Sequence, residues 1–396
     1  MFLERIEEDK QQYLTVLRNY SGKELYIFGK GEYSEYLRNF LKKEGYTVSG
    51  YFTSFANEGD AKNNARCITR YDEKKDKNIV ILIGTKYTKN DDIKNFLNSL
   101  GWKTVIDVPK HLKFFSKEII QDNLVPELEI TTTIGCRVNC RYCPQKMLIE
   151  RYKSSDVKTM QYDDYCKAID KLPENTIITF SGFAEPFLNP LAIGMMDYAF
   201  KKGHKVNLFT TFEGLLFEDF KRLEKIEFNT IVLHLPDKNK YANITVDDNY
   251  MRILDKAINQ KKKNGESWIS YANSQFEADE RIVALIGDKV RITGQMIDRA
   301  GNLEDDKLLS IDNCIKKGSH SYCERSLVLN HNVLLPNGDV VLCCMDFGIQ
   351  NVIGNLFRQS YEEIINSNRL KEILEQLDEA HLDNTICRHC INLQVW

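Results

Sequence analysis

The fold of this chain is decided by the stretch Thr131-Thr-Thr-Ile-Gly-Cys136-Arg-Val-Asn-Cys140-Arg-Tyr-Cys143-Pro, which places three cysteines in the spacing C-x3-C-x2-C. Thiolates are soft ligands that favour iron–sulfur clusters, zinc or Cu(I). Four of them close a cluster or a structural zinc site, whereas three leave one metal position open. Zinc hairpins usually use paired C-x2-C units. The spacing therefore favours an iron–sulfur cluster with one open iron over zinc that takes its fourth ligand elsewhere.

The same stretch resembles the signature of the radical S-adenosylmethionine (SAM) enzymes, and the resemblance covers roughly Pro126–Trp396. It implies that Cys136, Cys140 and Cys143 hold a [4Fe–4S] cluster, whose fourth iron binds the amino and carboxylate groups of SAM. In this family an electron from the cluster cleaves SAM into methionine and a 5′-deoxyadenosyl radical, which takes a hydrogen atom from the substrate. The resemblance also places Tyr142, just before the last cysteine, near the adenine.

Length, charge and composition limit the class of protein. A chain of 396 residues is long enough for two or three domains. Its net charge of −3 gives no global basic surface for nucleic acid, and apolar runs such as 79–83 are too short to span a bilayer. The N-terminus lacks the pattern of a secretory signal, and eleven cysteines then indicate metal or redox chemistry in a reducing compartment. We expect a cytoplasmic protein that binds neither nucleic acid nor membranes.

The first region, residues 1–121, alternates strands with helices and is expected to form a Rossmann-like parallel sheet. Gly29-Lys-Gly31 lies where a strand turns into a helix, the usual place for a phosphate. However, Ser34 replaces the third glycine of the dinucleotide motif, and no ribose-binding acid follows the second strand. The region resembles the small Rossmann-like domains of sugar-modifying acetyltransferases and some glycan-pathway enzymes. A tight turn in a docking domain is favoured over a nucleotide-sugar site.

The second region, residues 122–304, is expected to form an open (β/α)6 TIM-like partial barrel. Six strand candidates alternate with helices, which is too few for a closed eight-stranded barrel. Parallel barrels place their chemistry at the C-terminal ends of the strands, and the cysteine motif follows the first strand as this rule requires. The candidates are Leu128–Thr133, Thr176–Phe180, Val206–Thr210, Thr230–Leu233, Trp268–Ala272 and Val290–Thr293.

Further candidate contacts with SAM follow the second and third strands. Ser181-Gly182-Phe-Ala-Glu185-Pro186 resembles the family's Gly-Gly-Glu-Pro motif, which holds the SAM amino group, although Phe and Ala replace both motif glycines. Gly182, Glu185 and Pro186 are expected contacts; a simple turn at the strand end is the alternative. Thr210 and Thr211 stand where the family binds the ribose or carboxylate of SAM, and a helix-entry turn explains them as well.

Two residues after later strands are candidate catalytic groups. His234 follows the fourth strand and could reach ribose or substrate, or be structural. Arg299 follows the sixth strand, and a fixed guanidinium at a barrel mouth suits a carboxylate or a substrate oxygen.

The third region, residues 305–396, carries four further thiols that could close a metal site. Their order, C-x14-G-x4-C and then C-x2-C, is similar to the SPASM and shorter "twitch" auxiliary-cluster domains of the same family. The resemblance implies one auxiliary [4Fe–4S] cluster, although zinc would satisfy the same ligands. Cys344 could substitute for its neighbour, but adjacent strand residues point to opposite faces. The assigned ligands are Cys323, Cys343, Cys387 and Cys390.

Together these features predict a radical SAM enzyme that abstracts hydrogen from a substrate C–H bond. The Rossmann-like front domain favours a carbohydrate or nucleotide-sugar substrate, which would be oxidised or epimerised. A flavodoxin or ferredoxin would donate the electron. Two alternatives stay open: a radical SAM maturase of a peptide or protein, and a zinc-binding scaffold without catalysis.

Overall fold

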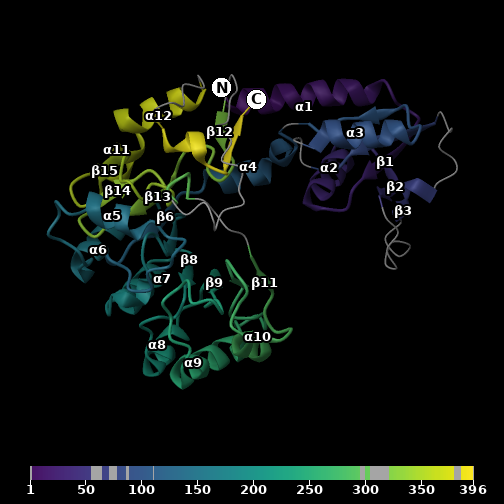
Figure 1. Ribbon diagram of the computed structural model, residues 1–396. Helices are drawn as coiled ribbons and strands as arrows, with labels where there is room; N and C mark the ends of the chain where they lie inside the picture. The colour runs from purple at the N-terminus through teal and green to yellow at the C-terminus, as the bar shows by residue number, and fades with distance from the viewer. Residues whose placement is uncertain are drawn as a thin grey trace. The chain divides into compact units, whose positions relative to one another are not determined.

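The computed structural model describes residues 2–54, 65–70, 78–85, 89–109, 111–294, 299–303, 321–378 and 385–395. The chain forms two compact units, Met1–Asp122 and Asn123–Trp396 (Figure 1). The boundary expected at 304–305 lies outside the described residues.

The first unit is built on a five-stranded parallel sheet with the order β3-β2-β1-β4-β5. This is a doubly wound order, in which the strand order reverses between β1 and β4. The predicted α/β class is confirmed. The elements are α1 (Phe2–Arg18), β1 (Glu24–Phe28), α2 (Glu32–Lys43), β2 (Val48–Thr53), β3 (Ala65–Cys67), β4 (Ile79–Ile83), α3 (Asn90–Ser99) and β5 (Val105–Ile106), followed by the 3-10 turn Leu112–Phe115 and by α4 (Lys117–Leu124).

The turn after β1 closes tightly on the end of β4. Gly29 has a φ of +116°, and the Ser34 hydroxyl donates to the Gly84 carbonyl at 2.7 Å. A Cβ on Gly84 would lie only 2.6 Å from the Ser34 Oγ, so this hydroxyl fills the space between the strand ends. β4 is buried along its whole length, as a central parallel strand must be.

The second unit contains a nine-stranded sheet with the order β11-β10-β9-β8-β7-β6-β13-β14-β15. Its first six strands are parallel and follow the predicted order. β13, from the C-terminal region, pairs in parallel with β6, so both regions share one sheet. The strands are β6 (Glu127–Ile130), β7 (Ile177–Phe180), β8 (Val206–Thr210), β9 (Thr230–His234), β10 (Tyr271–Asn273), β11 (Ile292–Thr293), β13 (His331–Leu334), β14 (Asp339–Val341) and β15 (Val352–Asn355), with β12 (Ser321–Cys323) and β16 (Leu393–Val395) in a separate pair.

The fifth barrel strand begins later than the sequence predicts. Trp268 packs its ring against Phe220 and Phe228, with centroids 5.1 and 6.0 Å away, and only Tyr271–Asn273 joins the ladder. An apolar run can thus fill the core without forming a strand, because burial and strand pairing favour the same residue types.

The helices of the second unit alternate with its parallel strands. α9 shows why they form: the Asp247 side chain caps its first turn by accepting from the Tyr250 N–H. Its buried residues Ile253, Leu254 and Ala257 recur at helical spacing. The helices are α5 (Gln145–Arg151), α6 (Tyr162–Ile169), α7 (Ala192–Lys201), α8 (Phe220–Leu223), α9 (Asp248–Asn259), α10 (Glu280–Ile286), α11 (Tyr361–Ile365) and α12 (Asn368–Asp378). No helix in the described part of the chain is long and apolar enough to cross a bilayer.

Candidate functional site

The three-cysteine loop leaves the C-terminal end of β6 and ends at α5. Asn139 occupies the left-handed region with a φ of +42°, and its N–H donates to the Cys136 carbonyl at 3.2 Å. The Cys143 N–H donates to the Cys140 carbonyl at 2.9 Å. These turns keep the loop compact and bring its thiols to the edge where parallel barrels place their chemistry.

The thiols share one cavity, of about 330 Å³, with most of the residues predicted to contact SAM or substrate. Pro186 is the exception. It is buried beneath the cavity at the start of a 3-10 turn, where its carbonyl accepts from the Thr132 hydroxyl at 3.1 Å. The predicted residues that line the cavity are Cys136, Cys140, Tyr142, Cys143, Gly182, Glu185, Thr210, Thr211, His234 and Arg299.

The three core thiols are partly buried, and their surroundings disfavour the free thiolate form. Burial raises the pKa of Cys140 to about 12, and the neighbouring Cys143 contributes to the rise. Such thiols stay protonated unless a metal takes them as thiolates. No three cysteine, histidine or acidic side chains of the described residues converge closely enough for one ion.

Glu185 is fully engaged by the chain itself. Its carboxylate accepts from the Thr210 hydroxyl at 2.6 Å, from the Thr211 N–H and hydroxyl at 2.6 and 2.7 Å, and from the Phe187 N–H at 3.3 Å. Four donors match the capacity of a carboxylate. Burial nevertheless raises the pKa of Glu185 above its ordinary value. A ligand ammonium would therefore have to share or displace the Thr211 donors.

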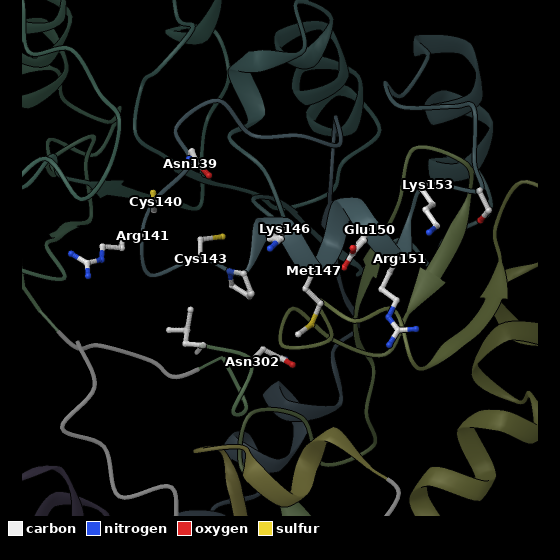
Figure 2. Close-up of a pocket in the computed structure, with 13 residues that line it drawn as sticks. Asn139, Cys140, Arg141, Cys143, Lys146, Met147, Glu150, Arg151, Lys153 and Asn302 are labelled. Carbon is white, nitrogen blue, oxygen red and sulfur yellow. The ribbon is translucent and has the colours of Figure 1, made fainter. Parts of the chain in front are cut away.

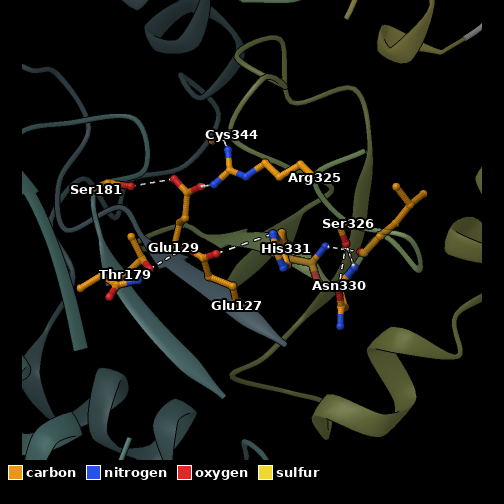
Figure 3. Close-up of polar contacts among 12 residues, drawn as sticks. Glu127, Glu129, Thr179, Ser181, Arg325, Ser326, Asn330, His331 and Cys344 are labelled. Carbon is orange, nitrogen blue, oxygen red and sulfur yellow. Dashed lines mark hydrogen bonds and ion pairs between the residues drawn. The ribbon is translucent and has the colours of Figure 1, made fainter. Parts of the chain in front are cut away.

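A buried ion pair borders the same cavity, and the sequence analysis missed it (Figure 3). The Arg325 guanidinium donates to Glu129 at 2.6 Å and to the Cys344 sulfur at 2.7 Å. The Ser181 hydroxyl donates to the other Glu129 oxygen at 2.7 Å. Burial would raise the pKa of Glu129, but Arg325 and the hydrogen bonds together hold it below its ordinary value. The sequence did contain a sign of this ion pair, because Glu127 and Glu129 place two acidic side chains on one face of a buried strand.

The two candidate catalytic residues, His234 and Arg299, both line the cavity but differ in charge. Burial and the positive charge of Arg299 lower the pKa of His234 to about 4. Arg299 has a φ of +55°, and its guanidinium lies 5.8 Å from the Phe347 ring centroid. Within the described residues Arg299 has no ion-pair partner. It is thus a cation open to a ligand, whereas His234 is a neutral hydrogen-bonding group.

The four predicted auxiliary ligands line a second, smaller pocket of about 40 Å³. Burial and the neighbouring thiols of Cys344, Cys387 and Cys390 raise the pKa of Cys343. Cys344 borders this pocket as well, but it also lines the first cavity, where Arg325 holds its sulfur. Cys343 and Cys344, which follow β14, therefore differ: Cys343 lines only the small pocket, whereas Cys344 also lines the core cavity. The residues that share the small pocket are Cys323, Cys343, Cys387 and Cys390.

Comparison with known families identifies this part of the chain. Residues 323–391 match the SPASM model, described as an iron–sulfur cluster-binding domain. Residues 323–391 thus form an iron–sulfur cluster-binding SPASM domain. The auxiliary iron–sulfur domain predicted from the C-terminal cysteines is confirmed.

Several solved structures are similar to this chain. BtrN in complex with AdoMet and 2-DOIA is 16% identical with a TM-score of 0.46, and the match covers 68% of this chain and 93% of that chain. Native anSMEcpe with bound AdoMet is 14% identical with a TM-score of 0.39, over 67% and 87%. Streptococcus suis SuiB bound to precursor peptide SuiA is 13% identical with a TM-score of 0.41, over 73% and 79%. No curated protein matches the chain.

The SPASM domain closes one side of the core cavity. Cys344, Met345 and Phe347, which follow β14, line that cavity together with the core thiols. The Phe347 ring packs 4.6 Å from Phe183, which follows β7. Cys344, the neighbour of the predicted auxiliary ligand Cys343, therefore borders the same cavity as the three core thiols.

Proposed function

We propose that this protein is a radical SAM enzyme that cleaves SAM reductively and abstracts hydrogen from a C–H bond of a small polar substrate, in the class of carbohydrates or nucleotide-sugars. One observation carries the proposal: the cavity at the barrel rim is lined by the three core thiols and by Cys344 of the SPASM domain. A cluster bound by the core thiols would supply the electron that cleaves SAM.

The chain's own residues bind and orient the reactants. Tyr142 lies on the cavity wall, with its ring 5.7 Å from that of Phe276, and offers an aromatic surface to the adenine. Arg299 suits the SAM carboxylate or a substrate oxygen, because its guanidinium lines the cavity and can donate to both oxygens of a carboxylate. Burial of Phe183 and Phe347 excludes water from the side that faces the SPASM domain, which protects a radical from side reactions.

The polar lining supports a hydroxyl-bearing substrate. Tyr271, Asn273 and Gln275 line the cavity with groups that both donate and accept hydrogen bonds. Both buried carboxylates, Glu129 and Glu185, are already occupied by protein donors.

The proposal is tested by anaerobic reconstitution with iron and sulfide, followed by SAM and dithionite. We expect 5′-deoxyadenosine, and none from a variant in which Cys136, Cys140 and Cys143 are changed to Ala. Deuterium transfer from labelled candidate sugars into 5′-deoxyadenosine then identifies the substrate. Iron-loaded wild-type protein that never forms this product would show the proposal to be wrong. Colourless protein with stoichiometric zinc would support the scaffold alternative instead.

A further inference from the structure

The three-cysteine loop separates two hollows of the second unit. Its inner side faces the cavity described above, and its outer side borders a cleft of about 860 Å³. Cys140 and Cys143 line both. A cluster held by this loop would therefore lie close to the outer cleft as well as to the bound SAM.

Four of the 13 residues that line the outer cleft are cations (Figure 2). Lys146 and Arg151 project from α5, and Lys153 follows directly after it. Arg141 lies between the two cysteines, with its guanidinium 5.2 Å from the Tyr241 ring centroid. Glu150 is the one acidic side chain among the described residues of the lining. The rim is thus basic, although the whole chain has a net charge of −3.

Three of the cations lie on the surface. Lys146, Arg151 and Lys153 are all exposed, and no ion pair holds them within the described part of the chain. On the exposed face of a surface helix, basic side chains usually form ion pairs with acidic side chains three or four residues away. A cationic rim beside a cofactor loop instead creates a local field that attracts an anionic surface.

We propose that this basic cleft is the docking site of an acidic one-electron carrier, a flavodoxin. The inference rests on the proposed function, which requires one electron from outside for each cleavage of SAM. The carrier is oxidised by one electron and the core cluster is reduced by one, with no change of bonds in the chain. Docking in the cleft brings the carrier's flavin to the outer side of the loop that holds Cys140 and Cys143. Charge complementarity supplies both steering and orientation, and such redox contacts are typically small and weak.

The test compares two reductants on the reconstituted full-length protein. In Lys146→Glu/Lys153→Glu, flavodoxin hydroquinone should form 5′-deoxyadenosine about tenfold more slowly than in wild type at low salt, since steering accounts for a factor of roughly 10 to 1,000. Dithionite, a small reductant that needs no docking, should support wild-type rates. The control Lys221→Glu/Lys225→Glu makes the same change of charge on and after α8, and should behave as wild type with both reductants.

A second readout does not depend on turnover. The affinity of oxidised flavodoxin, measured by calorimetry, should fall in Lys146→Glu/Lys153→Glu and not in the control. Raising salt should weaken binding by wild type and have much less effect on that variant. Equal flavodoxin-supported rates and affinities in the two double variants would overturn the docking site, and so would a rim that binds RNA but not flavodoxin. If the wild type forms no 5′-deoxyadenosine with dithionite, the proposed function itself is wrong.

Discussion

At the scale of single residues, neighbouring thiols acquire different surroundings. Cys343 shares its pocket with Cys323, Cys387 and Cys390, whereas the sulfur of Cys344 accepts a hydrogen bond from Arg325. The two residues follow β14 in a turn, where the Asp346 N–H donates to the Cys343 carbonyl at 3.0 Å, and not in the strand that the sequence predicts. One thiol can therefore be a ligand while the other borders the core cavity.

This difference predicts which of the two thiols holds the auxiliary cluster. In a background with Cys136, Cys140 and Cys143 changed to Ala, Cys344→Ala should keep about four irons per chain after reconstitution. Cys343→Ala should lose them, because its thiol completes the small pocket. Iron analysis and visible absorption measure the outcome. Loss of the iron in the Cys344 variant alone would reverse the assignment.

The low pKa of His234, about 4, predicts how stability depends on pH. The unfolded chain takes up a proton at this side chain near pH 6.5, but the folded chain does not, so stability falls as pH decreases through 6.5 toward 4. Relative to His234→Asn, the wild type should lose about 1 kcal/mol between pH 7.5 and 5.5. Anaerobic urea unfolding at both pH values measures this difference. A constant difference between the two proteins would show that His234 titrates normally.

At the scale of elements, the loop after β7 depends on one glycine. Gly182 has a φ of +62°, and its N–H donates to Glu129 at 3.3 Å. A Cβ at this position would lie 2.2 Å from the Thr131 Oγ1 and 3.1 Å from the Thr131 backbone. Thr131 in turn leads from β6 into the three-cysteine loop, so a shift there moves the cluster ligands.

We therefore expect Gly182→Ala to weaken SAM binding at least tenfold and to cost about 2 kcal/mol of stability, because alanine is strained in this conformation and clashes with Thr131. Calorimetry under anaerobic conditions measures the first effect, and urea unfolding the second. Gly194→Ala in α7 is the matched control: its Cβ meets the Tyr162 ring at 3.4 Å, and helix propensity favours it. SAM binding of Gly182→Ala at the wild-type level would contradict the account.

At the scale of the whole molecule, the core and SPASM regions form one folding unit. β13 extends the barrel sheet beside β6, and the Asn330 amide donates to the Leu124 carbonyl at the end of α4. The first unit has a parallel sheet and a core of its own. Each of the two units is therefore built around its own main sheet.

This architecture predicts how fragments behave. Residues 1–116 should unfold cooperatively on their own, and residues 117–396 should still bind iron and form 5′-deoxyadenosine with dithionite. A fragment cut at 304 should lose the core cluster too, because β6 would lose its partner strand β13. Circular dichroism and iron analysis check these outcomes. A stable, iron-binding fragment 117–304 would show that the barrel does not need the SPASM strands.

The sequence by itself predicted the three-cysteine loop at the end of β6, the order of the six parallel strands and the four C-terminal thiols that share the small pocket. Ligand spacing and hydrophobic patterning are local properties, so they can be recognised without coordinates. Only the tertiary structure decided that Glu185 is saturated by Thr210 and Thr211, and that Cys344 turns to Arg325. It also paired Arg325 with Glu129, which lies 196 residues away. Such partners meet only when distant segments pack together, and no local pattern records which side chains will then share a buried space.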